Sequence, residues 1–151
     1  MVAFDWGEGI KWSAYLDTLV DEIVMTATIP NKSYLSVGFG PTMRETDMIV
    51  WRWNDDETEV DNLWSTSYSR PASDGTDHLK TAIQDSDDGQ FKIFTTRRAF
   101  DTGNARDFVI DPDAGEMVMC WAHKTRDGQF TEHRNRDVFA VNFSSPAAVV
   151  D

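Results

Sequence analysis

Four kinds of side chain in this sequence could take part in chemistry: a loop methionine, three histidines, one cysteine and many carboxylates. Met43 stands in the stretch Gly-Phe-Gly-Pro-Thr-Met-Arg-Glu-Thr, which breaks an extended pattern and predicts a polar loop. Two interpretations of Met43 stay open at this point. Either it folds back and fills a gap over the core, or its thioether faces a bound cofactor. Met48 lies nearby inside an apolar run, which favours core packing for it.

The histidines and the cysteine give no catalytic pattern when each is taken alone. His78 begins a polar stretch, and His123 ends an apolar strand, where we expect it at the surface. His133 stands just before the last predicted strand. Cys120 is the single cysteine, so no disulfide can form within the chain, and its apolar neighbours predict a buried, inert thiol.

The carboxylates are numerous, but no pair of them is singled out for glycoside hydrolysis. The run from Asp85 to Gln90 contains Asp-Gly, which favours a hairpin turn over a calcium loop. The acidic run from Asp55 to Asp61 favours a solvated loop. The sequence has no nucleophile elbow, dinucleotide fingerprint, phosphate loop or His-Glu-x-x-His motif. These observations favour an electron-transfer or binding domain over an enzyme acting by itself.

Composition narrows the class of protein. The chain has 151 residues, 40% hydrophobic and 26% charged, which suits one globular domain. Its six Trp and nine Phe support a rigid core or a flat ligand site. The formal net charge of −12 argues against nucleic acid and anionic membranes as partners. No apolar segment is long enough for direct membrane insertion.

The first residues lack a signal peptide, which predicts either an intracellular chain or a mature or excised domain. Asn31 and Asn142 begin Asn-x-Ser sequons, which permit glycosylation in a secreted protein. Both an intracellular and a secreted location therefore stay open.

Short apolar and β-branched runs separated by turn signals predict eight to ten strands and almost no helix. We expect a single domain over residues 1–151, an antiparallel immunoglobulin-like β-sandwich with its core in residues 10–143. Residues 1–9 predict an irregular lead-in, and residues 144–151 a loosely held tail or linker. Residues 22–39 predict a hairpin. The continuous apolar run of residues 47–53 predicts burial on both faces, or one face under a ligand. The predicted strands are 10–16, 22–29, 33–39, 47–53, 60–68, 91–97, 116–123 and 137–143.

The order of several motifs resembles the DOMON domain family over most of the chain, from about Ile10 to Phe143. The resemblance begins with Ile10-Lys-Trp12, continues with Tyr34-Leu-Ser-Val-Gly-Phe-Gly40, and places Met43 shortly before the run 47–51. Later come Thr96-Arg97 and Thr102-Gly103 before Asp107, then the run 117–122, His133 and the closing run 138–143. The family includes the haem domain of cellobiose dehydrogenase and auxin-induced plant cytochromes.

The resemblance implies that Met43 and His133, 90 residues apart, are the two axial ligands of a haem iron. Such a six-coordinate iron has no open site and suits single-electron transfer. The chain has no Cys-x-x-Cys-His motif, so the group would be a non-covalent haem b. The implied partner is a redox protein or a fused redox domain, and the implied location is extracellular or in the secretory lumen. Candidate slot residues are Phe39, Trp51, Trp53 and Trp121, and candidate propionate partners are Arg44, Arg134 and Arg136.

A second interpretation within the same family also stays open. Some DOMON domains bind no haem and are thought to bind carbohydrate or to serve in adhesion and extracellular assembly. Exposed aromatic rings would then stack on sugars, with Trp6, Trp12, Trp64 and Tyr68 as the candidates. Met48 is a second candidate for the iron ligand if haem is bound.

Overall fold

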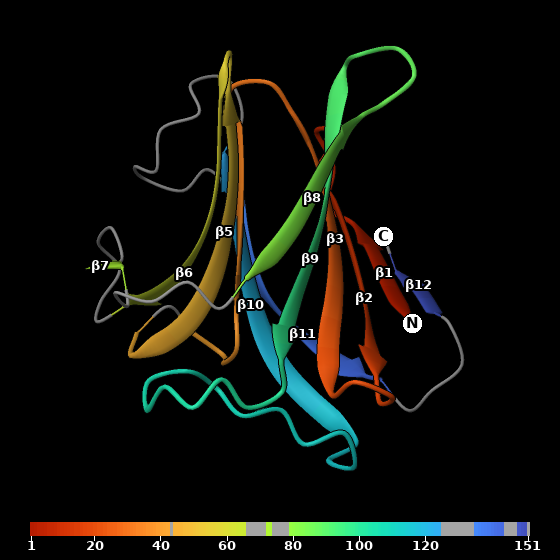
Figure 1. The fold of residues 1–151 in the computed structure, drawn as a ribbon. Helices are drawn as coiled ribbons and strands as arrows, with labels where there is room; N and C mark the ends of the chain where they lie inside the picture. Colours follow the sequence, from red (N-terminus) through yellow and green to blue (C-terminus); the bar gives the residue numbers. More distant parts are fainter. Residues whose placement is uncertain (43, 66–71, 74–78, 125–134, 144–147, 151) are drawn as a thin grey trace.

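The computed structural model describes residues 1–42, 44–65, 72–73, 79–124, 135–143 and 148–150, and these form two packed β-sheets (Figure 1). Within these ranges no helix is long and apolar enough to cross a membrane. The strands are β1 (Val2–Asp5), β2 (Lys11–Asp17), β3 (Glu22–Pro30), β4 (Ser33–Gly38), β5 (Thr46–Asn54), β6 (Glu57–Ser65), β7 (Ala72–Ser73), β8 (Lys80–Asp85), β9 (Phe91–Ala99), β10 (Glu116–Lys124), β11 (Asn135–Asn142) and β12 (Ala148–Val150).

The first sheet has the order β12-β1-β2-β3-β9-β8, and the second has the order β11-β10-β4-β5-β6-β7. All neighbouring strands pair antiparallel except β1 and β12, which are parallel. The predicted all-β sandwich is therefore confirmed. β7 and β8 fall between the predicted strands 60–68 and 91–97, where the sequence predicted no strand. Two further unpredicted strands lie near the ends of the chain: β1 falls in the expected lead-in, and β12 in the expected loose tail. They pair with each other, so the two ends of the chain stabilise one another at the edge of a sheet.

The predicted hairpin over residues 22–39 is wrong, because β3 and β4 belong to different sheets. Both edges of β3 are taken, by β2 and β9, so β4 pairs with β5 and β10 instead. The turn between β3 and β4 crosses from one sheet to the other. Its Asn31 side chain accepts hydrogen bonds from the backbone N–H of Lys32 at 2.8 Å and of Asp55 at 2.7 Å. The second bond ties the crossing to the turn between β5 and β6.

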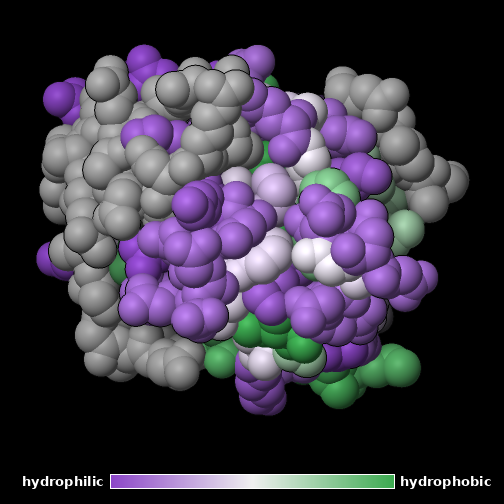
Figure 2. All heavy atoms as spheres, turned by 90° about the horizontal axis from the view of Figure 1, so that it is seen from above, coloured by the Kyte–Doolittle hydropathy of each residue, from purple (hydrophilic) through white to green (hydrophobic). Residues whose placement is uncertain are grey.

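The main core lies between the sheets and is built by alternation along the strands. In β5, Ile49, Trp51 and Trp53 point inward, toward residues such as Trp12 and Phe94 of the first sheet. The predicted turn at Asp85–Gln90 is confirmed as the connection between β8 and β9, with Gly89 in the left-handed region. The end of the sandwich at the top of Figure 1, seen from above in Figure 2, is mainly hydrophilic where it is described.

Candidate functional site

The loop between β4 and β5 carries Met43, which itself lies outside the described residues. The loop is held at its base, where the backbone N–H of Phe39 donates to the carbonyl of Asp47 at 2.9 Å. The hydroxyl of Thr46 lies 2.8 Å from the carbonyl of Arg44 and also contacts the carbonyl of Thr42. Both residues that flank Met43 are thus tied back to the start of β5.

A second apolar cluster lies on the face of the second sheet that points away from the first sheet. Along each strand alternate residues face opposite sides, so the side chains next to the core residues of β4, β5 and β10 gather there. Their burial confirms one of the two alternatives predicted for residues 47–53, burial of the strand on both faces. The cluster consists of Tyr34, Met48, Val50, Cys120 and Ala122, with Leu63 packed against it.

Gly38 keeps this face of the second sheet flat beside Cys120, its register partner on β10. A Cβ atom at Gly38 would lie 2.8 Å from the sulfur of Cys120 and 3.0 Å from a methyl carbon of Thr46. No side chain larger than hydrogen therefore fits there without displacing a neighbour.

A cavity of about 600 Å³ opens next to Cys120 on the same side of the sheet. This volume lies within the range of small-molecule and cofactor sites. Its walls come from the β4–β5 loop, from β10 and from β11, and its lining residues are Pro41, Thr42, Cys120, Trp121, Arg136, Asp137 and Val138. Thr42 directly precedes Met43 in the chain, and Arg136 follows His133 by three residues.

Of the eight predicted cofactor-binding residues, Met43, His133 and Arg134 lie outside the described residues. Trp121 lines the cavity, and Arg44 is exposed on the loop that forms one of its walls. Phe39, Trp51 and Trp53 instead belong to the core between the sheets. The Trp51 indole donates to the Thr96 hydroxyl at 3.0 Å, so it has a structural partner there. Contacts of these residues with haem stay a prediction.

Comparison with known proteins places the chain in a family. Residues 10–124 match the DOMON domain. The chain belongs to the DOMON family. The matched span contains Met43 and ends before His133. No curated protein matches the sequence.

Two solved structures share the fold of this DOMON domain. The cytochrome b domain of pyranose dehydrogenase from Coprinopsis cinerea is 18% identical with a TM-score of 0.69; the match covers 88% of this chain and 76% of that one. The cytochrome domain of Myriococcum thermophilum cellobiose dehydrogenase is 12% identical with a TM-score of 0.64; the match covers 89% and 75%. At these identities the likeness establishes the fold alone.

Cys120 lines the cavity, but its thiol is unreactive. Burial raises the pKa of the Cys120 thiol to about 11, although a hydrogen bond with the backbone of Gly38 acts in the opposite direction. The thiol is therefore neutral at physiological pH, and a neutral thiol is a poor nucleophile and a poor metal ligand. Among the described residues, no three His, Cys, Asp or Glu side chains converge into a metal site.

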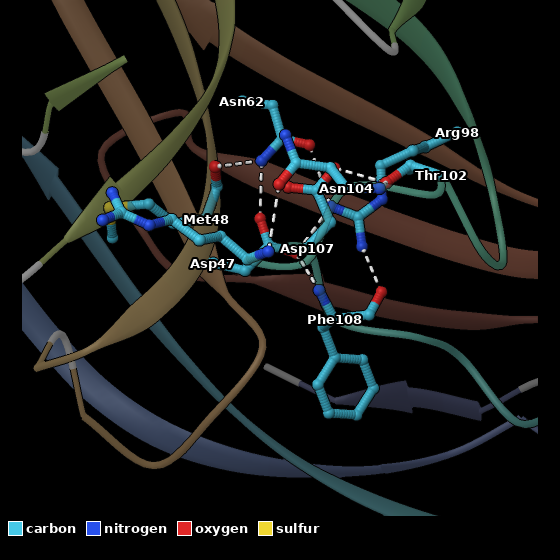
Figure 3. A network of polar contacts seen from close by, with 9 residues as sticks. Asp47, Met48, Asn62, Arg98, Thr102, Asn104, Asp107 and Phe108 are labelled. Carbon is cyan, nitrogen blue, oxygen red and sulfur yellow. Dashed lines mark hydrogen bonds and ion pairs between the residues drawn. The ribbon is translucent and has the colours of Figure 1, made fainter. Parts of the chain in front are cut away.

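Sequence reasoning missed a buried polar network that fixes one end of the DOMON sandwich (Figure 3). Arg98 is fully buried, and its guanidinium donates to Asp47 at 2.7 Å, to Asn62 at 2.9 Å and to the carbonyl of Phe108 at 2.9 Å. Asp47 also accepts the backbone N–H of Phe108 at 2.7 Å. The sequence signal for this network was Arg98 itself, an arginine in a strand rich in β-branched and aromatic residues. A charged side chain that is buried in such a strand needs a polar partner.

The predicted surface position of His123 is also wrong, because this side chain is fully buried. Its ring stacks on Trp121 at 5.1 Å, and Nε2 lies 3.4 Å from the carbonyl of Trp6. Nδ1 makes no hydrogen bond within the described structure and lies 3.8 Å from the Glu8 carboxylate. Burial lowers the pKa of His123 below its ordinary 6.5, against weaker opposing effects of the Trp6 carbonyl and Glu8. His123 is therefore neutral in the folded protein at pH 7.

The aromatic residues considered for sugar stacking are largely covered. Trp12 is only 1% exposed, so its prediction as a surface platform is wrong. Trp6 is half-buried and stacks against Trp12 at 5.9 Å and against Trp121 at 5.0 Å, which occupies its ring faces. Trp64 is half-buried beneath the guanidinium of Arg106, and Tyr68 lies outside the described residues.

Proposed function

We propose that this DOMON domain binds haem b non-covalently and transfers single electrons, with Met43 and His133 as the axial ligands. The cavity beside Cys120 is the observation that carries the proposal. It has the volume of a cofactor site, it borders the second apolar cluster at Cys120, and its lining includes the neighbour of Met43 and residues shortly after His133. The likeness to two cytochrome domains supports this reading.

A haem iron held by Met and His has no vacant coordination position, so it supplies outer-sphere electron transfer and no oxygen activation. The described residues contribute an environment suited to such a group. Val138 offers apolar contact, and the neutral Cys120 thiol does not compete for the iron. Arg136 lines the cavity, Arg44 lies on its wall-forming loop, and Arg134 is close in sequence, so these three arginines are the candidate partners of the propionates.

The proposed partner is a redox protein or a redox domain of the same polypeptide, and the proposed location is extracellular or in the secretory lumen. Both solved relatives are cytochrome domains of dehydrogenases, which supports a dehydrogenase as the class of electron donor. The sequons at Asn31 and Asn142 support the location, since both side chains are exposed. Mass spectrometry of protein secreted from a eukaryotic host tests whether either asparagine carries a glycan.

Absorption spectroscopy tests haem binding. Purified protein, reconstituted with haemin and then reduced with dithionite, should give a low-spin b-type spectrum in both oxidation states. Met43→Ala and His133→Ala should each change that spectrum, while the controls Met48→Leu and His78→Ala should keep it. A protein that stays colourless after reconstitution would overturn the proposal, and a spectrum altered by Met48→Leu alone would reassign the methionine ligand.

A second experiment tests where the haem lies. Val138 lines the cavity and is 49% exposed, so Val138→Trp should obstruct the cavity and weaken haemin binding at least about tenfold. Val118 is a matched control on the neighbouring strand, 45% exposed and outside the cavity lining. Equal haemin affinities of the Val138→Trp and Val118→Trp variants would place the haem elsewhere.

A further inference from the structure

The loop between β9 and β10 presents two adjacent apolar side chains to solvent. Phe108 is 39% exposed and Val109 is 55% exposed. The loop lies at the bottom of Figure 1, at the opposite end of the sandwich from the face in Figure 2. The turn between β2 and β3 lies at this end too and exposes Leu19 and Val20.

These segments are joined through the backbone. The N–H of Phe100 donates to the carbonyl of Asp21 at 2.8 Å, and the N–H of Ile110 donates to the carbonyl of Phe100 at 2.9 Å. Asp21 directly follows Val20, and Ile110 directly follows Val109. The exposed apolar residues therefore come from chain segments that are hydrogen-bonded side by side.

Two backbone hydrogen bonds and one aromatic stacking contact hold Phe108 in place. Its N–H donates to Asp47 and its carbonyl accepts from Arg98, both members of the buried network in Figure 3. Its ring stacks on Phe39 with centroids 5.6 Å apart and planes 7° apart, and the Arg98 guanidinium lies 4.5 Å from the centroid of the Phe39 ring. A surface held this firmly loses little conformational entropy when a partner covers it.

Acidic residues stand on both sides of the exposed pair in the same loop. The loop of residues 100–115 contains four aspartates and a single arginine, and Asp101, Asp111 and Asp113 are exposed. Local turns order these residues, since Asp101 and Asp111 each accept a backbone N–H from two residues further along at 2.9 Å. The loop thus exposes an apolar pair together with aspartates that precede and follow it in the chain. Interfaces commonly combine an apolar core with a polar rim.

We propose that Phe108, Val109 and the aspartates around them form a docking surface for a protein face with an apolar centre and a rim of Lys and Arg. The Phe108 ring stacks on Phe39, which precedes the cavity residue Pro41 by two positions, so the start of the β4–β5 connection links the surface to the cavity. The role of the docked protein as the electron-exchange partner rests on the proposed function, whereas the docking itself does not. The opposite charges steer association and fix the orientation of the complex.

The test uses cytochrome c, a small basic electron-transfer protein, as the probe. Its Kd is measured by calorimetry at low and at physiological ionic strength, with the full chain both without haem and after reconstitution. The double variant Asp111→Asn/Asp113→Asn should raise the Kd roughly 5- to 10-fold at low salt, and less at higher salt. Val109→Ser should raise it roughly fivefold, and this loss should persist at higher salt.

Matched controls separate a specific surface from general attraction to an acidic protein. Asp87→Asn/Asp88→Asn removes the same charge from the β8–β9 turn at the other end, and Ile83→Ser alters a side chain that is 43% exposed on β8. Both controls should leave the Kd within about twofold of the parent value. No binding of cytochrome c, or controls that weaken it as much as the loop variants, would overturn the proposal. Binding to the haem-free chain keeps this test separate from that of haem binding.

Discussion

Replacement of Arg98 by Met should destabilise the protein more than any neighbouring charge substitution. The Arg98 side chain is fully buried, and its ion-pair partner Asp47, at 2.7 Å, is only 3% exposed. Removing one partner of a buried pair leaves the other charge uncompensated, which typically costs about 3–5 kcal/mol. Asp47 keeps hydrogen bonds from Asn62 and from the N–H of Phe108, so the lower end, about 3 kcal/mol, is expected.

The assay is urea unfolding followed by tryptophan fluorescence. With a urea m-value of about 2 kcal/mol/M, a loss of about 3 kcal/mol lowers the midpoint by about 1.5 M. Arg97→Met is the matched control on the same strand, because Arg97 pairs with Asp17 and Glu22 at the surface. Exposed ion pairs contribute little, so the midpoint of this control should change far less.

Two further measurements distinguish the buried charge from simple loss of packing. Arg98→Met/Asp47→Asn removes both charges and should regain part of the stability lost in the single variant. The backbone amide of Phe108 donates a hydrogen bond to Asp47, and Asp47 is held in place by Arg98. This amide should therefore exchange with deuterium faster in Arg98→Met than in the parent protein. A midpoint in Arg98→Met equal to that in Arg97→Met would refute the reasoning. So would a double variant that is less stable than Arg98→Met.

Two other predictions concern buried titratable groups. The pKa of His123 is lowered in the folded state, so the unfolded chain binds the proton more tightly; stability from this group is present above pH 6.5 and is lost as the pH falls below it. Urea midpoints at pH 7.5 and 5.5 should therefore differ less in His123→Gln than in the parent protein, and equal differences would contradict the prediction. The Cys120 thiol, with its pKa raised to about 11, should resist a disulfide reagent at pH 8 and react fully in denaturant. Rapid labelling of the native protein would contradict its burial.

Local sequence signals predicted most strands because they depend on residues close together in the chain. Alternation and turn residues gave the positions of β2, β3, β5 and β10 to within one or two residues. The Asp-Gly turn and the double burial of β5 were predicted for the same reason. Motif order also led to the DOMON family, which the match over residues 10–124 confirms. The ligand roles of Met43 and His133 stay predictions.

Contacts between distant segments could not be predicted in this way. Nothing near β3 in the sequence shows that the distant β9 takes the edge opposite β2, so a hairpin with β4 was expected. His123 was expected at the surface because the residues that cover it, Trp6 and Glu8, lie at the other end of the chain.

The sequence by itself determined the class of fold, since a period of two in apolar residues and frequent turns specify a sandwich. Only the tertiary structure decided which buried polar groups find partners. Arg98 meets Asp47 from a different sheet, and that pairing fixes the loop that exposes Phe108. The physical reason is that burial and ion pairing depend on distances in space, and strand pairing sets those distances between residues far apart in the chain.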